Sequence, residues 1–274
     1  MSRLRKEWMT TLEDELVAYE QELILKIGLD FVGIAAACGG VSRSTILEAS
    51  DTVGIAVVTV TSGLGEISGF AGCVAAILSQ AGFNTKIMPH TDVHGLFDAY
   101  RADNIGFAFL ADDDTYIAID LNRRCVSENS NATARAFVTA LDAMVPDGIK
   151  GEDVLVMGCG RVGMRAGQIL LEKQAVPIFY DKYKMPNSVG EFSDFSFCTR
   201  VEEIKEYKYI LDATSEGDWL SSDMLHKGAI IAAPGVPLSL TEDSAKSFAH
   251  SLVHDILHIG TLAMLGELCG ELYS

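Results

Sequence analysis

Apolar positions near the start of the chain recur every three or four residues over 11–27, between acidic side chains, which predicts an amphipathic helix. A shorter helix is expected just before it, over residues 2–9. Short apolar runs then alternate with helical patterns. The predicted strands are 54–60, 85–88, 105–110 and 116–120, and the predicted helices are 70–80, 92–100 and 131–144. Strands that alternate with helices indicate an α/β domain built on a parallel sheet.

The same alternation continues in the second half of the chain, after the stop signal Pro146-Asp147-Gly148. The predicted strands there are 154–157, 176–180, 195–198, 207–213, 229–233 and 251–254, followed by a closing helix over 258–272. We place the domain boundary at the stop signal. The expected architecture is therefore an N-terminal α/β domain preceded by helices, residues 1–147, and a C-terminal α/β domain, residues 148–274.

The first strand of the C-terminal domain leads directly into a Gly-x-Gly-x-x-Gly turn. Its glycines are Gly158, Gly160 and Gly163, and Arg161 and Val162 lie between the last two. In such a turn the first glycine permits the tight bend, the second lets the backbone approach a pyrophosphate, and the third lets the next helix pack closely on the strand. The N–H groups at the start of that helix face the phosphates. The pattern predicts a C-terminal Rossmann domain that binds a dinucleotide.

The acidic residue Asp181 decides which dinucleotide is expected. It follows the next predicted strand, 18 residues after Gly163, where a carboxylate accepts hydrogen bonds from the adenosine ribose and repels the 2′-phosphate of NADP. The predicted cofactor is therefore NAD, and a glycine-rich turn that binds nothing is the weaker alternative. Thr214, Ser215 and Pro234 follow later strands and are expected to contact the cofactor. Helix capping is an equal alternative for Thr214 and Ser215.

Composition narrows the classes of partner. The chain has 38 acidic and 21 basic residues, a formal net charge of −17, which argues against nucleic acid and anionic membrane surfaces and favours a cationic substrate. The six cysteines include no Cys-x-x-Cys pair, so neither a disulfide framework nor structural zinc is expected. The longest apolar run, residues 31–38, is too short to span a bilayer. We expect a cytoplasmic protein, with a homodimer as the candidate assembly.

Three polar clusters in the N-terminal half are candidates for substrate binding. The first, residues 61–69, contains Ser62 in a glycine-rich turn that could hold a carboxylate, or that needs glycine only for positive φ. The second contains Asp103 and Asn104, which could bind an amine and accept a proton, or end a helix. The third, residues 112–114, is three aspartates, which we expect to form a hairpin turn and not a metal site.

Two histidine pairs are further candidates. His90 with His94, and His254 with His258, lie near predicted junctions between strands and helices, so either pair could face a cleft as a proton relay. The second pair has the i,i+4 spacing of metal ligands, but Asp255 between them does not match a metalloprotease helix. A capped or core histidine is the commoner outcome for each of them, and no metal is expected.

The chain resembles the PylD family of pyrrolysine biosynthesis dehydrogenases over essentially its full length. The resemblance rests on residues 4–27, 26–30, 35–39, 100–104 and 158–163. It implies NAD-dependent oxidation of the terminal amine of (3R)-3-methyl-D-ornithyl-N6-L-lysine, loss of ammonia and ring closure to L-pyrrolysine. It also implies an N-terminal helix that closes over an extended, dipeptide-like substrate.

Oxidation of a carbon that carries an amine requires the amine to be unprotonated, so the site needs a proton acceptor and a dry environment. Asp103 is the leading candidate to hold this amine, with Asn104 beside it, and Leu4 is expected to line an apolar wall along the substrate. Another NAD-dependent amino-acid or imino-acid dehydrogenase is the alternative among enzymes. A non-catalytic NAD-sensing regulator is the alternative outside them.

Overall fold

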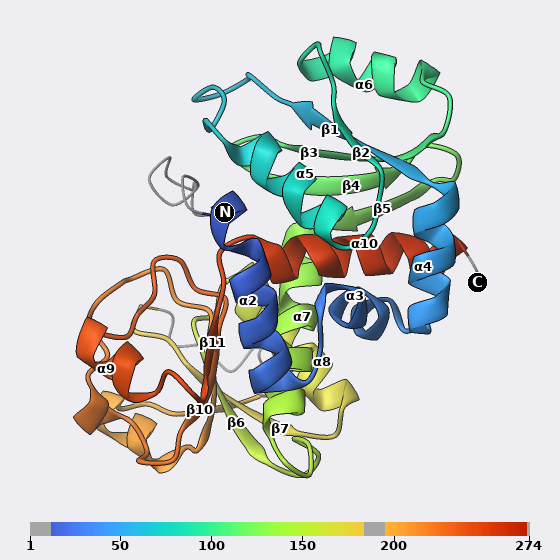
Figure 1. The fold of residues 1–274 in the computed structure, drawn as a ribbon. Coiled ribbons are helices and arrows are strands. Elements are labelled where there is room, and N and C mark those ends of the chain that lie inside the picture. The colour runs from blue at the N-terminus through green and yellow to red at the C-terminus, as the bar shows by residue number, and fades with distance from the viewer. Residues whose placement is uncertain (1–11, 184–194, 273–274) are drawn as a thin grey trace. The chain divides into compact units, whose positions relative to one another are not determined.

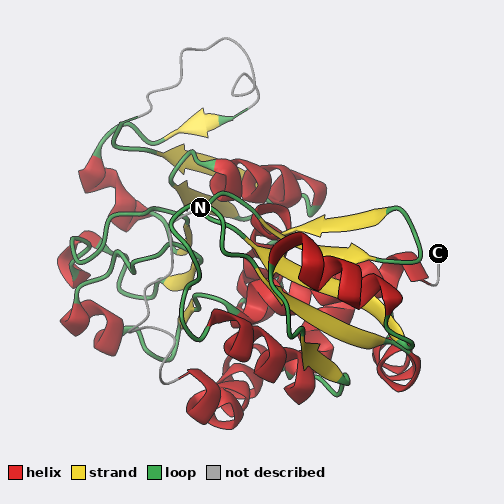
Figure 2. Ribbon diagram, turned by 90° about the horizontal axis from the view of Figure 1, so that it is seen from above, coloured by secondary structure: helices red, strands yellow, loops and turns green. Residues whose placement is uncertain are grey.

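The computed structural model describes residues 12–183 and 195–272 (Figure 1). The helix expected over 2–9, and with it Leu4, lies outside the described residues. Helices and strands alternate along most of the described chain (Figure 2). Contacts divide the chain into two compact units, unit 1 with residues Met1–Thr133 and Leu257–Ser274, and unit 2 with residues Ala134–Ile256.

Unit 1 is built on a five-stranded mixed sheet. Its strands are β1 (Gly54–Thr59), β2 (Thr85–Ile87), β3 (Ile105–Ala111), β4 (Tyr116–Asp120) and β5 (Cys125–Glu128), in the order β2-β1-β3-β4-β5. Strand β1 pairs in parallel with β2 and β3, whereas β4 pairs antiparallel with both β3 and β5. Helices α5 (Phe70–Gln80) and α6 (Asp92–Arg101) connect the parallel strands. The predicted α/β domain is confirmed, and β5 is an addition that the sequence analysis did not include.

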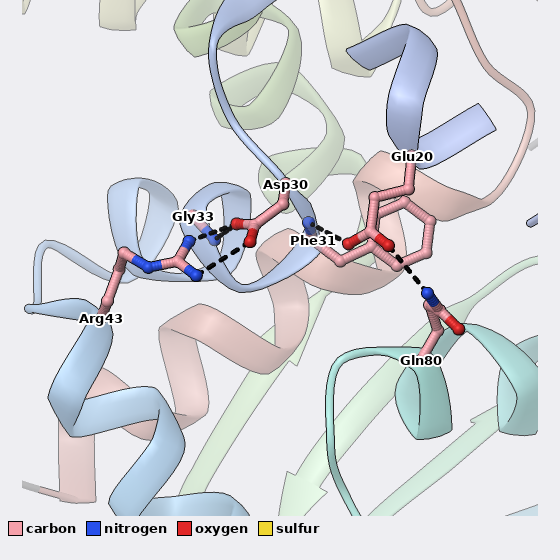
Figure 3. A network of polar contacts seen from close by, with 6 residues as sticks. All are labelled: Glu20, Asp30, Phe31, Gly33, Arg43 and Gln80. Atoms are coloured by element: carbon pink, nitrogen blue, oxygen red, sulfur yellow. Dashed lines mark hydrogen bonds and ion pairs between the residues drawn. The ribbon is translucent and has the colours of Figure 1, made fainter. Parts of the chain in front are cut away.

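Three helices precede this sheet: α2 (Leu12–Ile27), α3 (Phe31–Gly39) and α4 (Arg43–Thr52). Asp30 caps α3, because its carboxylate accepts a hydrogen bond from a backbone N–H of the first turn at 2.8 Å, and it also pairs with the Arg43 guanidinium. Glu20 of α2 accepts hydrogen bonds from the Phe31 N–H at 3.0 Å and from the Gln80 side-chain amide at 2.7 Å. Figure 3 shows that these two carboxylates connect four helices of unit 1.

The last helix, α10 (His258–Leu272), packs against α3 within unit 1 (Figure 1). A Cβ built on Gly266 would overlap the carbonyl oxygen of Ala35, and one built on Gly39 would overlap the carbonyl oxygen of Gly266. The two backbones therefore approach as closely as glycine alone allows. The predicted boundary at residue 147 assigned this helix to the C-terminal domain. The contact division differs, because α10 buries its surface on unit 1 although it follows unit 2 in sequence.

Unit 2 is built on a six-stranded parallel sheet. Its strands are β6 (Asp153–Met157), β7 (Val176–Tyr180), β8 (Ser196–Phe197), β9 (Tyr209–Asp212), β10 (Ile230–Ala233) and β11 (Leu252–His254). Their spatial order, β8-β7-β6-β9-β10-β11, is 3-2-1-4-5-6 in chain order, which is the order of a Rossmann fold. The predicted Rossmann domain is confirmed.

Helix α7 (Asn129–Met144) precedes the first of these strands. Helices and short 3₁₀ turns connect the strands; they are α8 (Arg161–Glu172), η1 (Val201–Glu206), η2 (Ser222–Met224) and α9 (Glu242–Ser247). Leu155, Ile210 and Ile231, one from each of three neighbouring central strands, are fully buried in one cluster. These strands are covered on both faces, and apart from Asp153 and Asp212 at their ends their side chains form apolar runs, which is typical of a parallel sheet.

Candidate functional site

The glycine-rich turn after β6 has three glycines with three different environments. Gly158 has a φ of +93°, and a Cβ built on it would lie 2.8 Å from the carbonyl oxygen of Ala213. A Cβ on Gly163 would overlap the carbonyl oxygen of Gly158, so α8 can approach the turn only with glycine there. A Cβ on Gly160 would meet no atom within 4 Å. The first and third glycines are thus needed by the fold, and the second faces open space.

Helix α8 begins immediately after Gly160, with Arg161 and Val162 as its first residues. No side chain of the residue before the helix caps it. The first N–H groups of a helix have no partner within that helix, and the helix dipole makes this end positive. The open face of the turn and the start of α8 therefore together fit the pyrophosphate of a dinucleotide.

Asp181 follows β7 and reaches the glycine turn. One carboxylate oxygen accepts a hydrogen bond from the Cys159 N–H at 2.7 Å, and the other accepts one from the Tyr183 N–H at 2.8 Å. The carboxylate is partly exposed. It is therefore held beside the turn.

The carboxyl ends of β6, β9 and β10 meet at the same edge of the sheet. The Ala213 N–H donates to the Met157 carbonyl at 2.8 Å, and the Gly235 N–H donates to the Asp212 carbonyl at 2.9 Å. Thr214 and Pro234 thus lie on the loops beside the glycine turn, at the switch point of the sheet between β6 and β9, where Rossmann folds bind dinucleotides.

The loop at Thr214 is organised by a buried carboxylate that the sequence analysis missed. Asp212, fully buried at the end of β9, accepts hydrogen bonds from the N–H of Thr214 at 3.1 Å and from its hydroxyl at 2.7 Å. The Ser239 hydroxyl donates to its other oxygen. In this part of the described chain Asp218 and Trp219 are not helical, and the next helical turn after Ser215 starts only at Ser222. The helix-capping alternative for Thr214 and Ser215 is therefore wrong. An aspartate that closes an apolar strand was the available sequence signal.

Unit 1 has its own polar edge, at the carboxyl ends of β1 and β3. Asp92 accepts hydrogen bonds from the N–H of Thr61 at 2.8 Å and from its hydroxyl at 2.7 Å, while Asp113 accepts one from the Leu64 N–H at 2.6 Å. The pKa of Asp92 lies below its usual value. The hydrogen bond from the hydroxyl of the preceding threonine lowers it most, and the hydrogen bonds from Thr61 lower it further. The loop that carries Ser62 is thus attached to the unit on both sides. Its role as a carboxylate site stays a prediction. Gly63, Gly65 and Gly69 in this loop all have positive φ, as the alternative reading of the turn requires.

The aspartates at 112–114 form the predicted turn. The side chain of Asp112 accepts hydrogen bonds from the N–H groups of Asp114 and Thr115, both at 2.8 Å, between the antiparallel strands β3 and β4. This is the Asx-type turn expected of aspartate-rich hairpins, so the hairpin prediction is confirmed.

Asp103 and Asn104 lie at the opposite edge of the same sheet. Asn104 directly precedes β3, has a φ of +68°, and accepts a hydrogen bond from the Gly54 N–H at 2.8 Å. Because β1 and β3 are parallel, this edge holds their amino ends, whereas Ser62 follows the carboxyl end of β1. The structure does not bring Asp103 and Ser62 together. Both Asp103 and Asn104 are exposed, and their role in binding an amine stays a prediction.

The histidine pairs have different surroundings. His258 is buried in unit 1, with its ring 4.6 Å from that of Tyr19, and it is a core histidine. His254 belongs to unit 2, where its Nδ1 lies 2.8 Å from the Ala233 carbonyl. The two residues therefore belong to different compact units. His90 lies beside Asp98, with 2.6 Å between His90 Nδ1 and Asp98 Oδ2.

Known proteins resemble this chain both in its N-terminal part and along most of its length. Residues 9–127 match the family model described as pyrrolysine biosynthesis protein PylD, N-terminal domain. The chain is 28% identical over 240 residues to a pyrrolysine synthase of Methanosarcina barkeri, covering 87% of each protein. It is 26% identical over 267 residues to a pyrrolysine synthase of Methanosarcina acetivorans, covering 97% of this chain and 98% of that protein. The chain is thus similar to the PylD family, in its N-terminal part by the family model and along most of its length by the two relatives. The resemblance inferred from the sequence is thereby confirmed.

Solved structures show which fold this chain shares. Shikimate dehydrogenase from Aquifex aeolicus matches it with a TM-score of 0.51 and 13% identity, over 82% of this chain and 93% of that one. Shikimate 5-dehydrogenase from Thermus thermophilus, solved with NADP(H) and shikimate, matches with a TM-score of 0.51 and 15% identity, over 81% and 93%. At these identities the likeness shows the fold, that of Rossmann-type dehydrogenases.

Within residues 12–183 and 195–272, no helix combines the length and the apolar character that crossing a membrane requires.

Proposed function

We propose that this protein is an NAD-dependent oxidoreductase that acts on a carbon bearing an amine. In this proposal it oxidises the terminal amine of (3R)-3-methyl-D-ornithyl-N6-L-lysine, releases ammonia and closes the ring of L-pyrrolysine. The names of the two Methanosarcina relatives support the product. The Rossmann strand order and the open face of the glycine turn support a dinucleotide cofactor.

The position of Asp181 is the observation that carries the cofactor proposal. Its carboxylate lies at the glycine turn, 2.7 Å from the Cys159 amide nitrogen, where it can accept hydrogen bonds from ribose hydroxyls. Its negative charge opposes a 2′-phosphate. The next residue, Lys182, is the cation best placed in sequence to offset that charge, but it is paired with Glu216 at 3.1 Å. Both features favour NAD over NADP.

The proposed reaction balances with one oxidant. The carbon that bears the terminal amine gives up a hydride and its nitrogen gives up a proton, which leaves a C=N bond. Bound NAD would supply the hydride acceptor. The internal α-amine then adds to this carbon, and the terminal nitrogen leaves as ammonia, so the C=N bond of the ring forms without further oxidation. Confinement of one substrate in the site raises the effective concentration of the internal amine.

Two parts of unit 1 are proposed to bind the substrate. The loop with Ser62, held by Asp92 and Asp113, is the proposed site for a substrate carboxylate. The N–H groups of Thr61 and Leu64 already donate to the two aspartates, so other polar groups of the loop would hold that carboxylate. Asp103, with Asn104 beside it, is the proposed partner of the substrate ammonium and the acceptor of its proton. The competing role for Asp103 is a residue of the turn that ends α6. The net charge of −17 favours approach of a cationic substrate in either case.

The proposal is tested with the purified full-length chain, the ornithyl-lysine dipeptide, and NAD or NADP. We expect NADH absorbance to rise with NAD, together with one ammonia and one pyrrolysine for each NADH. A dipeptide acetylated on the terminal amine is the matched control, since it cannot form the C=N bond. NAD binding without NADH formation would favour a regulator. NADH formation from other amino acids, but not from the dipeptide, would favour a different dehydrogenase.

A further inference from the structure

The junction between β2 and α6 gathers two histidines and an aspartate that the proposed reaction does not use. His94 and Asp98 are i,i+4 on α6, so they share one face of the helix. His90 lies on the loop before α6 and is brought to that face because residue 95 is glycine. A Cβ on Gly95 would overlap the His90 carbonyl oxygen and would lie 2.8 Å from Val58 Cγ1. Loop and helix are therefore tightly packed against each other.

The three side chains converge on a small volume. His90 Nδ1 lies 2.6 Å from one oxygen of Asp98, and His94 Nε2 lies 3.8 Å from the other. The two imidazole rings stack with their centroids 3.7 Å apart and an angle of 6° between the planes. One ligand atom of each residue lies within 4.8 Å of the other two. Ligands bound at about 2.0–2.1 Å in a tetrahedral site lie roughly 3.4 Å apart, which the three side chains can reach. Because an imidazole binds a metal in its ring plane and the two rings are nearly parallel, at least one ring has to turn out of the stack when the ion binds.

We propose that His90, His94 and Asp98 form a binding site for a divalent transition-metal ion, with zinc as the representative ion. Two imidazoles and one carboxylate suit zinc, nickel or copper, whereas magnesium and calcium select oxygen ligands. Three protein ligands leave at least one position for water. The His90 and His94 side chains are 53% and 61% exposed, so an ion can enter from solvent.

A metal bound at this site would affect the start of α6, which is connected to the proposed substrate loop that carries Ser62. Asp92, in the first turn of α6, holds the loop that carries Ser62 through its hydrogen bonds to Thr61. An ion that joins His90 to α6 would fix the start of that helix. The metal proposal does not depend on dehydrogenase activity, because it rests on the geometry of the cluster alone.

The test is a calorimetric titration of the tag-free full-length chain with zinc chloride. We expect one ion bound for each chain, and at least tenfold weaker binding in His94→Ala and in Asp98→Asn. The matched control is His250→Ala, which removes an exposed histidine of unit 2 and should bind zinc like the parent. All three substitutions are at exposed or half-exposed side chains, and equal thermal midpoints without metal will show that the variants are folded.

Cobalt distinguishes this cluster from the cysteines. Burial raises the pKa of the Cys198 thiol to about 11 and that of Cys269 to about 12, which makes both poor metal ligands. We therefore expect cobalt to give ligand-field absorption without a thiolate charge-transfer band. Absence of zinc binding, unchanged binding in His94→Ala, or a thiolate band would each overturn the proposal.

Discussion

Gly160→Ala is the sharpest test of the glycine turn, because the substitution should leave the fold intact and disturb only the binding of the dinucleotide. Gly160 has φ −81° and ψ −175°, a conformation that alanine adopts without strain, and a Cβ there meets no atom within 4 Å. Alanine should therefore leave the free energy of unfolding of the apo protein unchanged, or raise it by up to about 1 kcal/mol because alanine lowers the conformational entropy of the unfolded chain. The new methyl group occupies the open face at which the pyrophosphate is proposed to lie.

The matched variant is Gly163→Ala, in which the Cβ overlaps the carbonyl oxygen of Gly158. Backbone cannot yield as a side chain does, so we expect a loss of at least roughly 1–3 kcal/mol, as in overpacked cores. For a protein of this size that corresponds to a fall in the thermal midpoint of roughly 2–4 °C per kcal/mol.

Calorimetric titration with NAD and thermal melting of both variants without NAD measure the two effects. We expect NAD affinity to fall at least tenfold, or about 1.4 kcal/mol, in Gly160→Ala with no loss of thermal stability. Normal NAD affinity in that variant would show that the turn does not hold the pyrophosphate. A large loss of thermal stability would show that a methyl group at position 160 does meet other atoms of the fold.

Three further predictions concern single carboxylates. Asp181→Ala should weaken NAD binding by about 1–3 kcal/mol, while Glu216→Gln, which releases Lys182, should improve NADP binding; titration with both cofactors decides, and equal affinities in the parent protein would refute the assignment. Asp103→Asn should lower the turnover rate far more than NAD affinity, with partial recovery at high pH where the substrate amine is neutral; near-normal turnover would leave Asp103 as a turn residue only. Asp30→Asn should cost about 0.2–1 kcal/mol at pH 7, because the hydrogen bond from its arginine partner, more than any other contact, lowers the pKa of Asp30. That stabilisation is present above the ordinary pKa of 3.8 and is lost as the pH falls through the lower folded value, so the difference between the two proteins in urea unfolding should disappear in acid.

Local patterns accounted for most of unit 2. The strand, the three glycines, the helix and Asp181 all lie within one βαβ stretch, and each residue is constrained by neighbours close to it in sequence. The unpredicted elements have weaker local signals. Helix α3 is apolar on nearly all sides, with Phe31, Ile34 and Ala35 among its buried residues, so it has no amphipathic period. Strand β5 has only four residues.

The candidate substrate residues show a second limit of prediction from the sequence. Ser62 and Asp103 are both polar residues at strand boundaries, and nothing in their spacing says which edge of a sheet each one reaches. The parallel pairing of β1 with β3 decides it, because Asp103 precedes β3 and Ser62 follows β1. The same topology brings His90 to the helix face that carries His94 and Asp98.

The fold class, the Rossmann turn and the resemblance to the PylD family follow from the amino-acid sequence alone, because short-range patterns of glycine, charge and apolar residues carry that information. Only the tertiary structure decided that α10 completes unit 1, that Asp212 organises the Thr214 loop, and that two histidines share one aspartate. The first feature depends on the close approach of segments far apart in sequence. The other two join residues two and eight positions apart, and they depend on how the loop after the strand folds. Glycine at position 266 satisfies many local patterns, and its requirement appears only when α3 lies against it.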